Sequence, residues 1–309
     1  GARIEHDKRK RNKTDFAIWI KAPKEHIMKW DSFFGPSYPG WHLECSTMSK
    51  KYLGDVFDIH TGGTDHISIH HENEIAQSES ASGKSFANYW MHNAFLNIDN
   101  KKMSKSLGNF FTVRDISEKY DLQVLRFFML SAHYRTALIF PAELMEASKN
   151  SLDRILTGVE NLRDIQAKNN NAAITDAELS NLEIAKVLKD KFVNSMDDDF
   201  NTPNALSVLF EMAREINKLK TEDAEKANGL AARLRELAGI LGLLQQDPEK
   251  FLQAGSDDDE VAKIEALIKQ RNEARAAKDW TAADAARNEL TAMGIVLEDG
   301  ANGTTWRKQ

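Results

Sequence analysis

The histidines and the only cysteine of this chain gather in one stretch of the sequence. Six of the nine histidines lie there with Cys45: His42, His60, His66, His70, His71 and His92. Imidazole and thiolate are ligands that zinc prefers in proteins. His70 and Glu74 are four residues apart in HHENEIAQ, so on a helix both side chains leave the same face and can meet one ion. With Cys45 as the third ligand, the pattern predicts a zinc site.

The same spacing also permits a structural interpretation. His70 and Glu74 can form an ordinary pair on a helix surface, and a free cysteine such as Cys45 is commonly a small buried apolar residue. Three protein ligands are too few for a closed tetrahedral structural site, but they suit a catalytic site that keeps one position open. From spacing alone, both interpretations stay open.

A second group of residues can bind phosphate. Lys102 and Lys105 lie three apart in NKKMSKSLGN, on a predicted loop with small hydroxyl residues between a strand and a helix. Such lysines would offset the charge that grows on the β- and γ-phosphates of ATP as pyrophosphate leaves. Two lysines at this spacing are common on surfaces, whereas the complete KMSKS followed by LGN resembles the signature of class I aminoacyl-tRNA synthetases.

A glycine pair follows a predicted strand and offers a nucleotide site. At Gly62 and Gly63, backbone amides without side-chain obstruction can approach a nucleotide, and the Asp65 carboxylate can accept ribose hydroxyls. We expect three further side chains to line the same crevice as substrate contacts, although each is equally compatible with a structural role: His60, Thr61 and His92.

A series of segments stands in the order seen in cysteinyl-tRNA synthetases, and the chain resembles that family over essentially its whole length. These segments are PGWHLECS, FDIHTGGTD, HHENEIAQ, NYWMHNAFL, KMSKSLGNFFTVRD, SAHYR, DDDFNTPNAL and GTTWRK. The resemblance implies a cysteine–tRNA ligase that activates cysteine with ATP and Mg²⁺, loses pyrophosphate, and transfers the cysteinyl group to tRNA(Cys). Lys102 and Lys105 would serve the first step.

The resemblance also assigns the metal ligands. The family's zinc is held by two cysteines, a histidine and a glutamate, which implies one zinc per chain with Cys45, His70 and Glu74 in three of the four places. The remaining cysteine, from a strand near the family's N-terminus, is absent here, and His66 or His71 are speculative replacements. Zinc bound to the substrate's sulfur would reject serine without an editing domain. Trp41 resembles the family's aromatic residue beside the amino acid; its alternative is core packing.

The start of the chain suggests that it was cut from something longer. It opens at Gly1 without a methionine, and the HIGH motif of class I synthetases is missing, since the segment His60–Gly63 matches a later loop of the family instead. We therefore expect the front of the catalytic domain to be absent and the chain to be inactive or nearly so alone. The missing N-terminal segment could be a separate polypeptide that stays associated with this chain.

Two other functions stay open. One is a ligase that joins cysteine to an amino sugar in thiol biosynthesis, which resembles the family around zinc and KMSKS. The other is a non-catalytic zinc- or tRNA-binding module derived from a synthetase. The DDDFNTPNAL and GTTWRK segments favour RNA, and three residues are candidate stacking or phosphate contacts: Arg287, Trp306 and Arg307. The alternative for these three is a hydrophobic tail anchor with solvated arginines.

The elements that must position these residues form three predicted domains. Residues 1–140 read as an α/β Rossmann-like half-domain with a parallel sheet of class I synthetase type, 141–250 as an α-helical bundle that binds the anticodon, and 251–309 as a small α+β tail. We expect buried strands at 56–60 and 94–98 and helices at 69–80, 113–132, 261–278 and from 280. A bundle stripe follows Leu152, Ile155, Leu156, Val159 and Leu162. Asn201 or Thr202 would cap a helix before Pro203, and a hairpin with turns at 299–300 and 302–303 ends the chain.

Composition sets outer limits. The formal net charge is −6, so the chain lacks the overall basic character of many nucleic-acid binders, although local basic clusters occur at 8–11 and 101–105. One cysteine excludes an intrachain disulfide and favours a reducing compartment. No apolar stretch approaches the length of a membrane span, and the start lacks the apolar core of a signal peptide. We expect a cytoplasmic protein that does not bind membranes.

Overall fold

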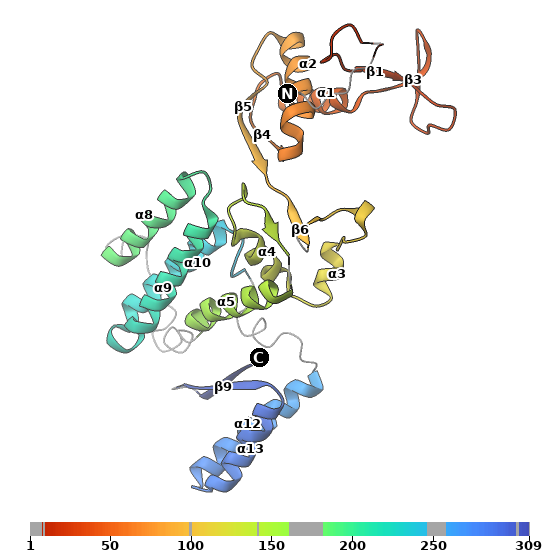
Figure 1. Cartoon of the computed structure of the whole chain (residues 1–309). Coiled ribbons are helices and arrows are strands. Elements are labelled where there is room, and N and C mark those ends of the chain that lie inside the picture. The colour runs from red at the N-terminus through yellow and green to blue at the C-terminus, as the bar shows by residue number, and fades with distance from the viewer. Residues whose placement is uncertain are drawn as a thin grey trace. The chain divides into compact units, whose positions relative to one another are not determined.

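The fold is known from a computed structural model, which describes residues 8, 10–98, 101–140, 142–160, 182–245, 258–300 and 303–308. The chain divides into two compact units (Figure 1). The first comprises Gly1–Leu96 with Tyr134–Ala137, and the second Asn97–His133 with Leu138–Gln309. No helix in the described ranges combines the length and apolar character that crossing a membrane requires. The three-domain division at residues 140 and 250 stays a prediction.

A small antiparallel sheet opens the first unit. Its strands β1 (Trp19–Lys21), β3 (Gly35–Pro39) and β2 (Trp30–Ser32) pair in that spatial order. The Trp19 indole donates a hydrogen bond to the buried Ser37 hydroxyl, which fixes the tryptophan over the sheet. This sheet leads directly through Gly40 into helix α1.

The rest of the first unit is a parallel strand pair with its crossover. Helix α1 (Trp41–Leu53) is followed by β4 (Phe57–Gly63), a 3₁₀ turn (Thr64–His66), a π-helix (Ile67–His71), helix α2 (Glu72–Ser82) and β5 (Ala87–Asn93). Parallel strands need such a crossover, and β4 pairs with β5 from Phe57 opposite Ala87 to Gly63 opposite Asn93. Helices α1 and α2 pack on each other. The predicted α/β class is confirmed.

Two strand predictions are corrected. The strand expected at 56–60 exists as β4, but most of its residues are exposed or half-buried rather than buried. The buried strand expected at 94–98 is wrong: only β6 (Leu96–Ile98) forms there, and it pairs antiparallel with β7 (Lys101–Lys102) beside β8 (Leu138–Ile139). The parallel partner of β4 is β5, in which polar Asn88, His92 and Asn93 interrupt the apolar pattern.

The segment after β7 holds the predicted phosphate loop and two helices. A 3₁₀ turn (Lys105–Leu107) precedes α3 (Val113–Ser117) and α4 (Leu122–Leu130), so the single helix expected at 113–132 is wrong. Helix α3 ends at Ser117, and Asp121 caps α4, since its carboxylate accepts from the Gln123 amide at 2.7 Å. Side chains with a strong capping preference can split an apolar run in this way.

Four described helices form the predicted bundle: α5 (Ala142–Glu160), α8 (Glu183–Asp197), α9 (Thr202–Glu222) and α10 (Ala224–Ile240). Helix α9 contacts each of the other three and also α4. The predicted stripe is buried at Leu152, Ile155 and Leu156, while the Val159 side chain and Leu162 lie outside the described residues. Asn201 caps α9 by accepting from the Asn204 amide at 3.2 Å, as predicted.

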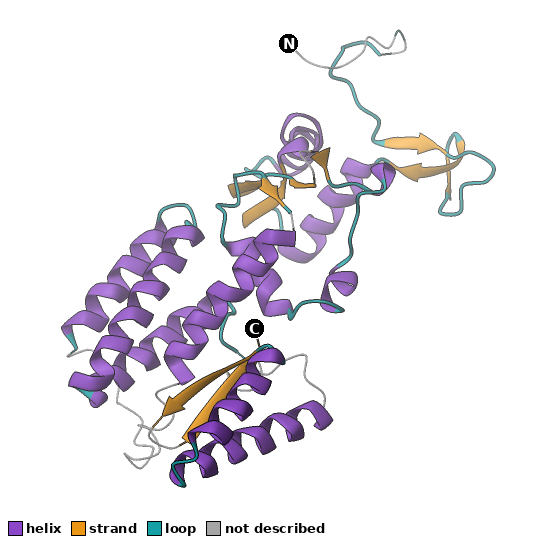
Figure 2. Cartoon of the chain, turned by 60° about the horizontal axis from the view of Figure 1, so that its bottom comes forward, coloured by secondary structure: helices purple, strands orange, loops and turns teal. Residues whose placement is uncertain are grey.

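The tail packs a hairpin on two helices (Figure 2). Helices α12 (Asp258–Ala276) and α13 (Trp280–Ala292) precede β9 (Ile295–Gly300) and β10 (Gly303–Lys308), which pair antiparallel. The predicted hairpin is confirmed, but Asp299 and Gly300 lie in the paired strand β9 and not in a turn. Asn302 of the expected turn lies outside the described residues. Its core comprises Ile264, Leu267, Ile268, Leu290, Ile295 and Trp306. Trp306 is therefore part of the core, so its prediction as a surface stacking residue is wrong.

Candidate metal centre and phosphate loop

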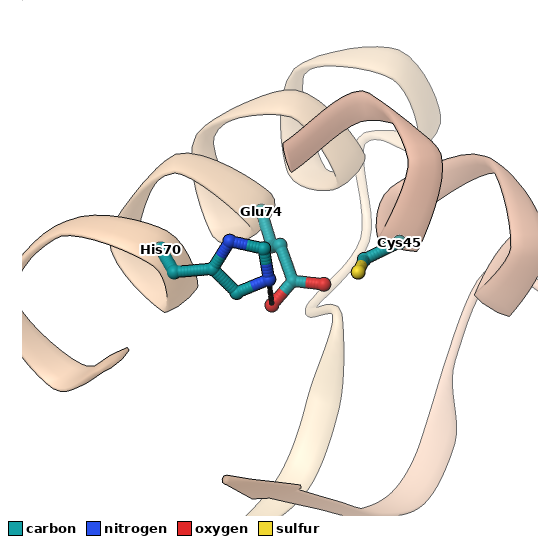
Figure 3. Close-up of side chains that lie close together, drawn as sticks. All are labelled: Cys45, His70 and Glu74. Carbon is teal, nitrogen blue, oxygen red and sulfur yellow. Dashed lines mark ion pairs between the residues drawn. The ribbon is translucent and has the colours of Figure 1, made fainter. Parts of the chain in front are cut away.

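Three predicted metal ligands lie together in the first unit. Single ligand atoms of Cys45, His70 and Glu74 all lie within 4.8 Å of one another (Figure 3). Cys45 comes from α1, His70 from the π-helix and Glu74 from α2, and the His70 Nε2 is 3.6 Å from the Glu74 Oε2. His70 and Glu74 are buried. The prediction of an ordinary surface pair therefore fails, because neither side chain is at the surface.

The Glu74 carboxylate has unused binding capacity. Its side chain is fully buried; Oε2 receives a contact from the His60 Nε2 at 2.9 Å, whereas Oε1 has no hydrogen-bond partner among the described residues. Burying an oxygen without a partner costs about 1–3 kcal/mol. The carboxylate extends toward the Cys45 sulfur (Figure 3). The Cys45 sulfur, a His70 nitrogen and this unpartnered Glu74 oxygen together form a donor set that fits zinc.

A second donor group shares the same carboxylate. His60, His71 and Glu74 also offer ligand atoms within 4.8 Å of one another, with the His71 Nε2 3.9 Å from the Glu74 Oε2. The His66 ring lies 5.2 Å from the His70 ring and 5.6 Å from the His71 ring, measured between centroids. Both speculative replacement ligands therefore border the site, and His71 reaches Glu74 directly.

Burial sets the protonation of these side chains. It is the main cause that lowers the pKa of His42, His70 and His92, and it lowers the pKa of His71 to about 4. These imidazoles are consequently neutral at pH 7, with a lone pair free for a metal or a hydrogen bond. Burial, followed by the Glu74 charge, raises the pKa of the Cys45 thiol. Metal binding at Cys45 must therefore displace a proton.

The other predicted contact residues are arranged around this centre. The Trp41 ring is 56% exposed and lies 4.3 Å from the His70 ring, so its core-packing alternative is wrong. The His92 Nε2 is 2.8 Å from the His71 Nδ1, which makes His92 a partner of the histidine cluster. Thr61 is exposed near the end of β4. Sequence reasoning missed the contact of His60 with Glu74, because it joins a strand to a helix fourteen residues later.

The glycine pair is shaped by its neighbours. A Cβ at residue 62 would lie 2.6 Å from the His71 ring, and a Cβ at residue 63 would lie 2.5 Å from the Asp65 Oδ1. Gly62 thus allows the strand end to approach the histidine cluster, and Gly63 allows the Asp65 carboxylate to lie over the backbone. The predicted nucleotide residues and the metal centre therefore lie at the same end of β4.

The KMSKS loop lies in the second unit, and hydrogen bonds from one side chain, Asn109, hold its backbone. The Asn109 side chain accepts from the Ser104 amide at 3.0 Å and donates to the Lys102 carbonyl at 3.3 Å. Lys102 and Lys105 are exposed, and the Lys105 Nζ lies 5.5 Å from the centre of the Phe110 ring. In the sequence, Asn109 is recognisable only as part of a signature, although its position directly after the loop is the signal for this role.

The parallel pair with its helical crossover and the KMSKS loop define a class I aminoacyl-tRNA synthetase fold. Three family models agree: tRNA synthetases class I (C) catalytic domain over residues 1–150, DALR domain over 191–245, and cysteinyl-tRNA ligase anticodon binding domain over 257–307. The chain belongs to the cysteinyl-tRNA ligase family.

Relatives support this assignment, and a solved structure is similar in fold. The chain is 60% identical over 309 residues to a cysteine–tRNA ligase of Haemophilus influenzae (strain 86-028NP), and 56% identical over 308 residues to one of Histophilus somni (strain 129Pt). It is covered completely in both and spans 64% of the length of each relative. A LeuRS–tRNA–LeuAMS complex from Agrobacterium radiobacter K84 matches 72% of this chain and 31% of its own, with a TM-score of 0.50 at 15% identity, which shows similarity of fold.

Proposed function

We propose that this chain serves a cytoplasmic cysteine–tRNA ligase, which activates cysteine with ATP and transfers the cysteinyl group to tRNA(Cys). The observation that carries this proposal is the sulfur, nitrogen and oxygen set of the half-buried Cys45 and the buried His70 and Glu74, in a chain 60% identical to such a ligase. An amino-sugar ligase is the less favoured alternative, because the match to an anticodon binding domain over residues 257–307 favours RNA.

One zinc ion per chain would be held by Cys45, His70 and Glu74, with a position left open. When bound, zinc would accept the substrate's sulfur as a thiolate, a bond that serine lacks. Around it, Trp41 covers His70 from the solvent side, and His60 orients the Glu74 carboxylate. His66 and His71 are candidates for a further ligand. Because burial lowers the pKa of His71 to about 4, its imidazole is neutral at pH 7 and keeps a lone pair available.

Two groups of residues, each within its own unit, offer chemistry suited to ATP and its Mg²⁺. Lys102 and Lys105 are exposed cations that would neutralise the departing pyrophosphate. At the end of β4, backbone amides of Gly62 and Gly63 and the Asp65 carboxylate would receive the nucleoside, with Thr61 and His92 nearby. Lys102 and Lys105 would therefore neutralise phosphate charge, whereas the glycine turn would let the backbone approach the nucleoside closely.

The tail offers a surface for RNA. A cavity of about 570 Å³ is lined by Arg287 and by Trp280, which is 62% exposed. Arg271 and Arg275 also line it, and both pair with the Asp299 carboxylate at the same cavity. Guanidinium groups pair with phosphate, and exposed aromatic rings stack on unpaired bases. Trp306 belongs to the tail core instead, where it is buried and donates to the Glu265 carboxylate. These features support tRNA binding by the tail.

Zinc content of the purified chain tests the metal part of this proposal. We expect close to one zinc per chain, lost in Cys45→Ala, His70→Ala and Glu74→Ala, and retained in the matched control Glu72→Ala, which alters an exposed carboxylate of the same helix. Added cysteine should then perturb the zinc-loaded protein where serine does not. Zinc retained by all three variants would refute the site, and binding of tRNA(Cys) measured separately tests the RNA part.

A further inference from the structure

His42 makes a contact that neither the zinc site nor the phosphate loop explains. Its Nδ1 lies 2.7 Å from the Nδ1 of His70, although the two residues are 28 positions apart. We propose that His42 is a positioning residue that holds His70 in the tautomer with its proton on Nδ1, so that the bare Nε2 faces the metal position. This inference rests on the proposed zinc site and adds a residue that sets its geometry.

The hydrogen-bond geometry requires one proton between the two rings. A neutral imidazole has one donor and one acceptor nitrogen, so two facing nitrogens at this distance share a single hydrogen. The other nitrogen of His70, Nε2, faces the Glu74 carboxylate at 3.6 Å (Figure 3). That distance is longer than a hydrogen bond, and Oε2 already has His60 as a partner. The bond to His42 is therefore the contact that decides the tautomer of His70.

Metal binding fixes which ring must donate. A histidine binds a metal through an unprotonated nitrogen, and its other N–H is normally held by an acceptor. Nε2 is the His70 nitrogen nearest to Glu74, so the proton belongs on His70 Nδ1 and the His42 Nδ1 accepts it. Glutamate or a carbonyl commonly fills this accepting role; here a second neutral imidazole does so.

His42 is itself held in place. The Phe16 ring meets its ring edge to face at 5.8 Å between centroids, and the Trp41 ring stacks on it at 5.9 Å. The buried Ser46 hydroxyl contacts both the His42 carbonyl at 3.0 Å and the Gln77 side chain at 2.8 Å, which ties α1 to α2. Helix α1 thus carries a proposed ligand, Cys45, together with the residue that orients the proposed ligand of the facing segment.

Two substitutions of His42 distinguish the effect of its hydrogen-bond acceptor from the effect of its volume. In His42→Asn, the side-chain Oδ1 stands where the Nδ1 stood and still accepts a hydrogen bond, whereas His42→Leu fills space without an acceptor. The ring ¹⁵N shifts of His70, identified by their loss in His70→Gln, report its tautomer in the zinc-free chain. Zinc affinity follows from competition with a chelator. The control is His26→Leu, because the His26 ring stacks on Tyr38 and is not part of the histidine cluster.

We expect His70 to carry its proton on Nδ1 in the wild type, in His42→Asn and in His26→Leu, and on Nε2 in His42→Leu. Zinc affinity should fall about 10- to 100-fold in His42→Leu, the usual effect of removing an outer partner, and should largely recover in His42→Asn. A proton on Nε2 in the wild type, or the same tautomer in all variants, overturns the inference. A chain that binds no zinc refutes the metal site instead, and the tautomers then still decide the role of His42.

Discussion

The Nε2 of His60 lies 2.9 Å from Oε2 of Glu74, a carboxylate with no exposed surface. His60 comes from the strand β4 and Glu74 from the helix α2, so the contact joins the sheet to the helix that supplies one of the three proposed ligands. A buried carboxylate that loses its donor keeps its full desolvation cost. The pair therefore matters to stability before any metal is bound.

We predict that His60→Ala destabilises the zinc-free chain by about 1–3 kcal/mol, because it leaves the buried Glu74 oxygen unpaired. Replacing both partners, as in His60→Ala with Glu74→Leu, should cost less than the sum of the two single changes. Urea unfolding followed by tryptophan fluorescence measures each variant. Strict additivity of the two substitutions would show that the pair is not coupled.

A second prediction concerns the fastening of the KMSKS loop. Asn109→Ala removes the acceptor of the Ser104 amide and the donor to the Lys102 carbonyl. A net loss of about 1 kcal/mol corresponds to roughly fivefold faster hydrogen exchange at that amide. The control Asn109→Asp keeps the acceptor and should leave the Ser104 amide protected. Equal exchange in Asn109→Ala and the wild type would mean that the loop is held by other contacts.

A third prediction is a dependence of tail stability on pH. The Asp299 carboxylate pairs with Arg271 and Arg275, each at 2.7 Å, and the Arg271 hydrogen bond is the main cause that lowers the pKa of Asp299. A lowered carboxyl pKa contributes stability above its ordinary value near about 3.9, and this contribution is lost as pH falls through the folded-state pKa.

Asp299→Asn should therefore destabilise the tail at pH 7 and have progressively less effect below about pH 4. Because the Asp299 side chain is 44% exposed, solvent screening limits the loss to about 0.5–1 kcal/mol. Hydrogen exchange of β9 and β10 amides in the whole chain measures it. The exposed Asp284→Asn in α13 serves as control, and a difference that grew toward low pH would contradict the sign of the argument.

Local spacing predicted the site better than it predicted the sheet. The His70 and Glu74 pair follows from one helical turn, and KMSKS is a continuous segment, so neither needs knowledge of distant contacts. Strand β5 was not predicted because polar residues interrupt its apolar pattern, and one of them, His92, contacts the histidine cluster through His71. The bonds from His42 to His70 and from His60 to Glu74 depend on how α1 and β4 pack against α2, which no short pattern encodes.

The last prediction contrasts two tryptophans of the tail. Trp280 is 62% exposed and lines the arginine-bearing cavity, whereas Trp306 is 4% exposed within the tail core. Trp280→Ala should leave thermal unfolding nearly unchanged and weaken binding of tRNA(Cys) about tenfold, the scale of one lost base-stacking contact. Trp306→Ala should instead destabilise the tail by about 3–5 kcal/mol, because it empties a packed core position.

Fluorescence anisotropy with labelled tRNA and hydrogen exchange of the β9–β10 hairpin separate these two effects. Arg287→Ala adds a charge test, since removal of one phosphate contact should lower the salt dependence of binding by about one counterion. Lys263→Ala, an exposed cation of α12 outside the cavity lining, is the matched control. If Trp280→Ala and Arg287→Ala both bound tRNA like the wild type, RNA recognition by this cavity would be excluded, while the buried role of Trp306 would stand on the exchange data alone.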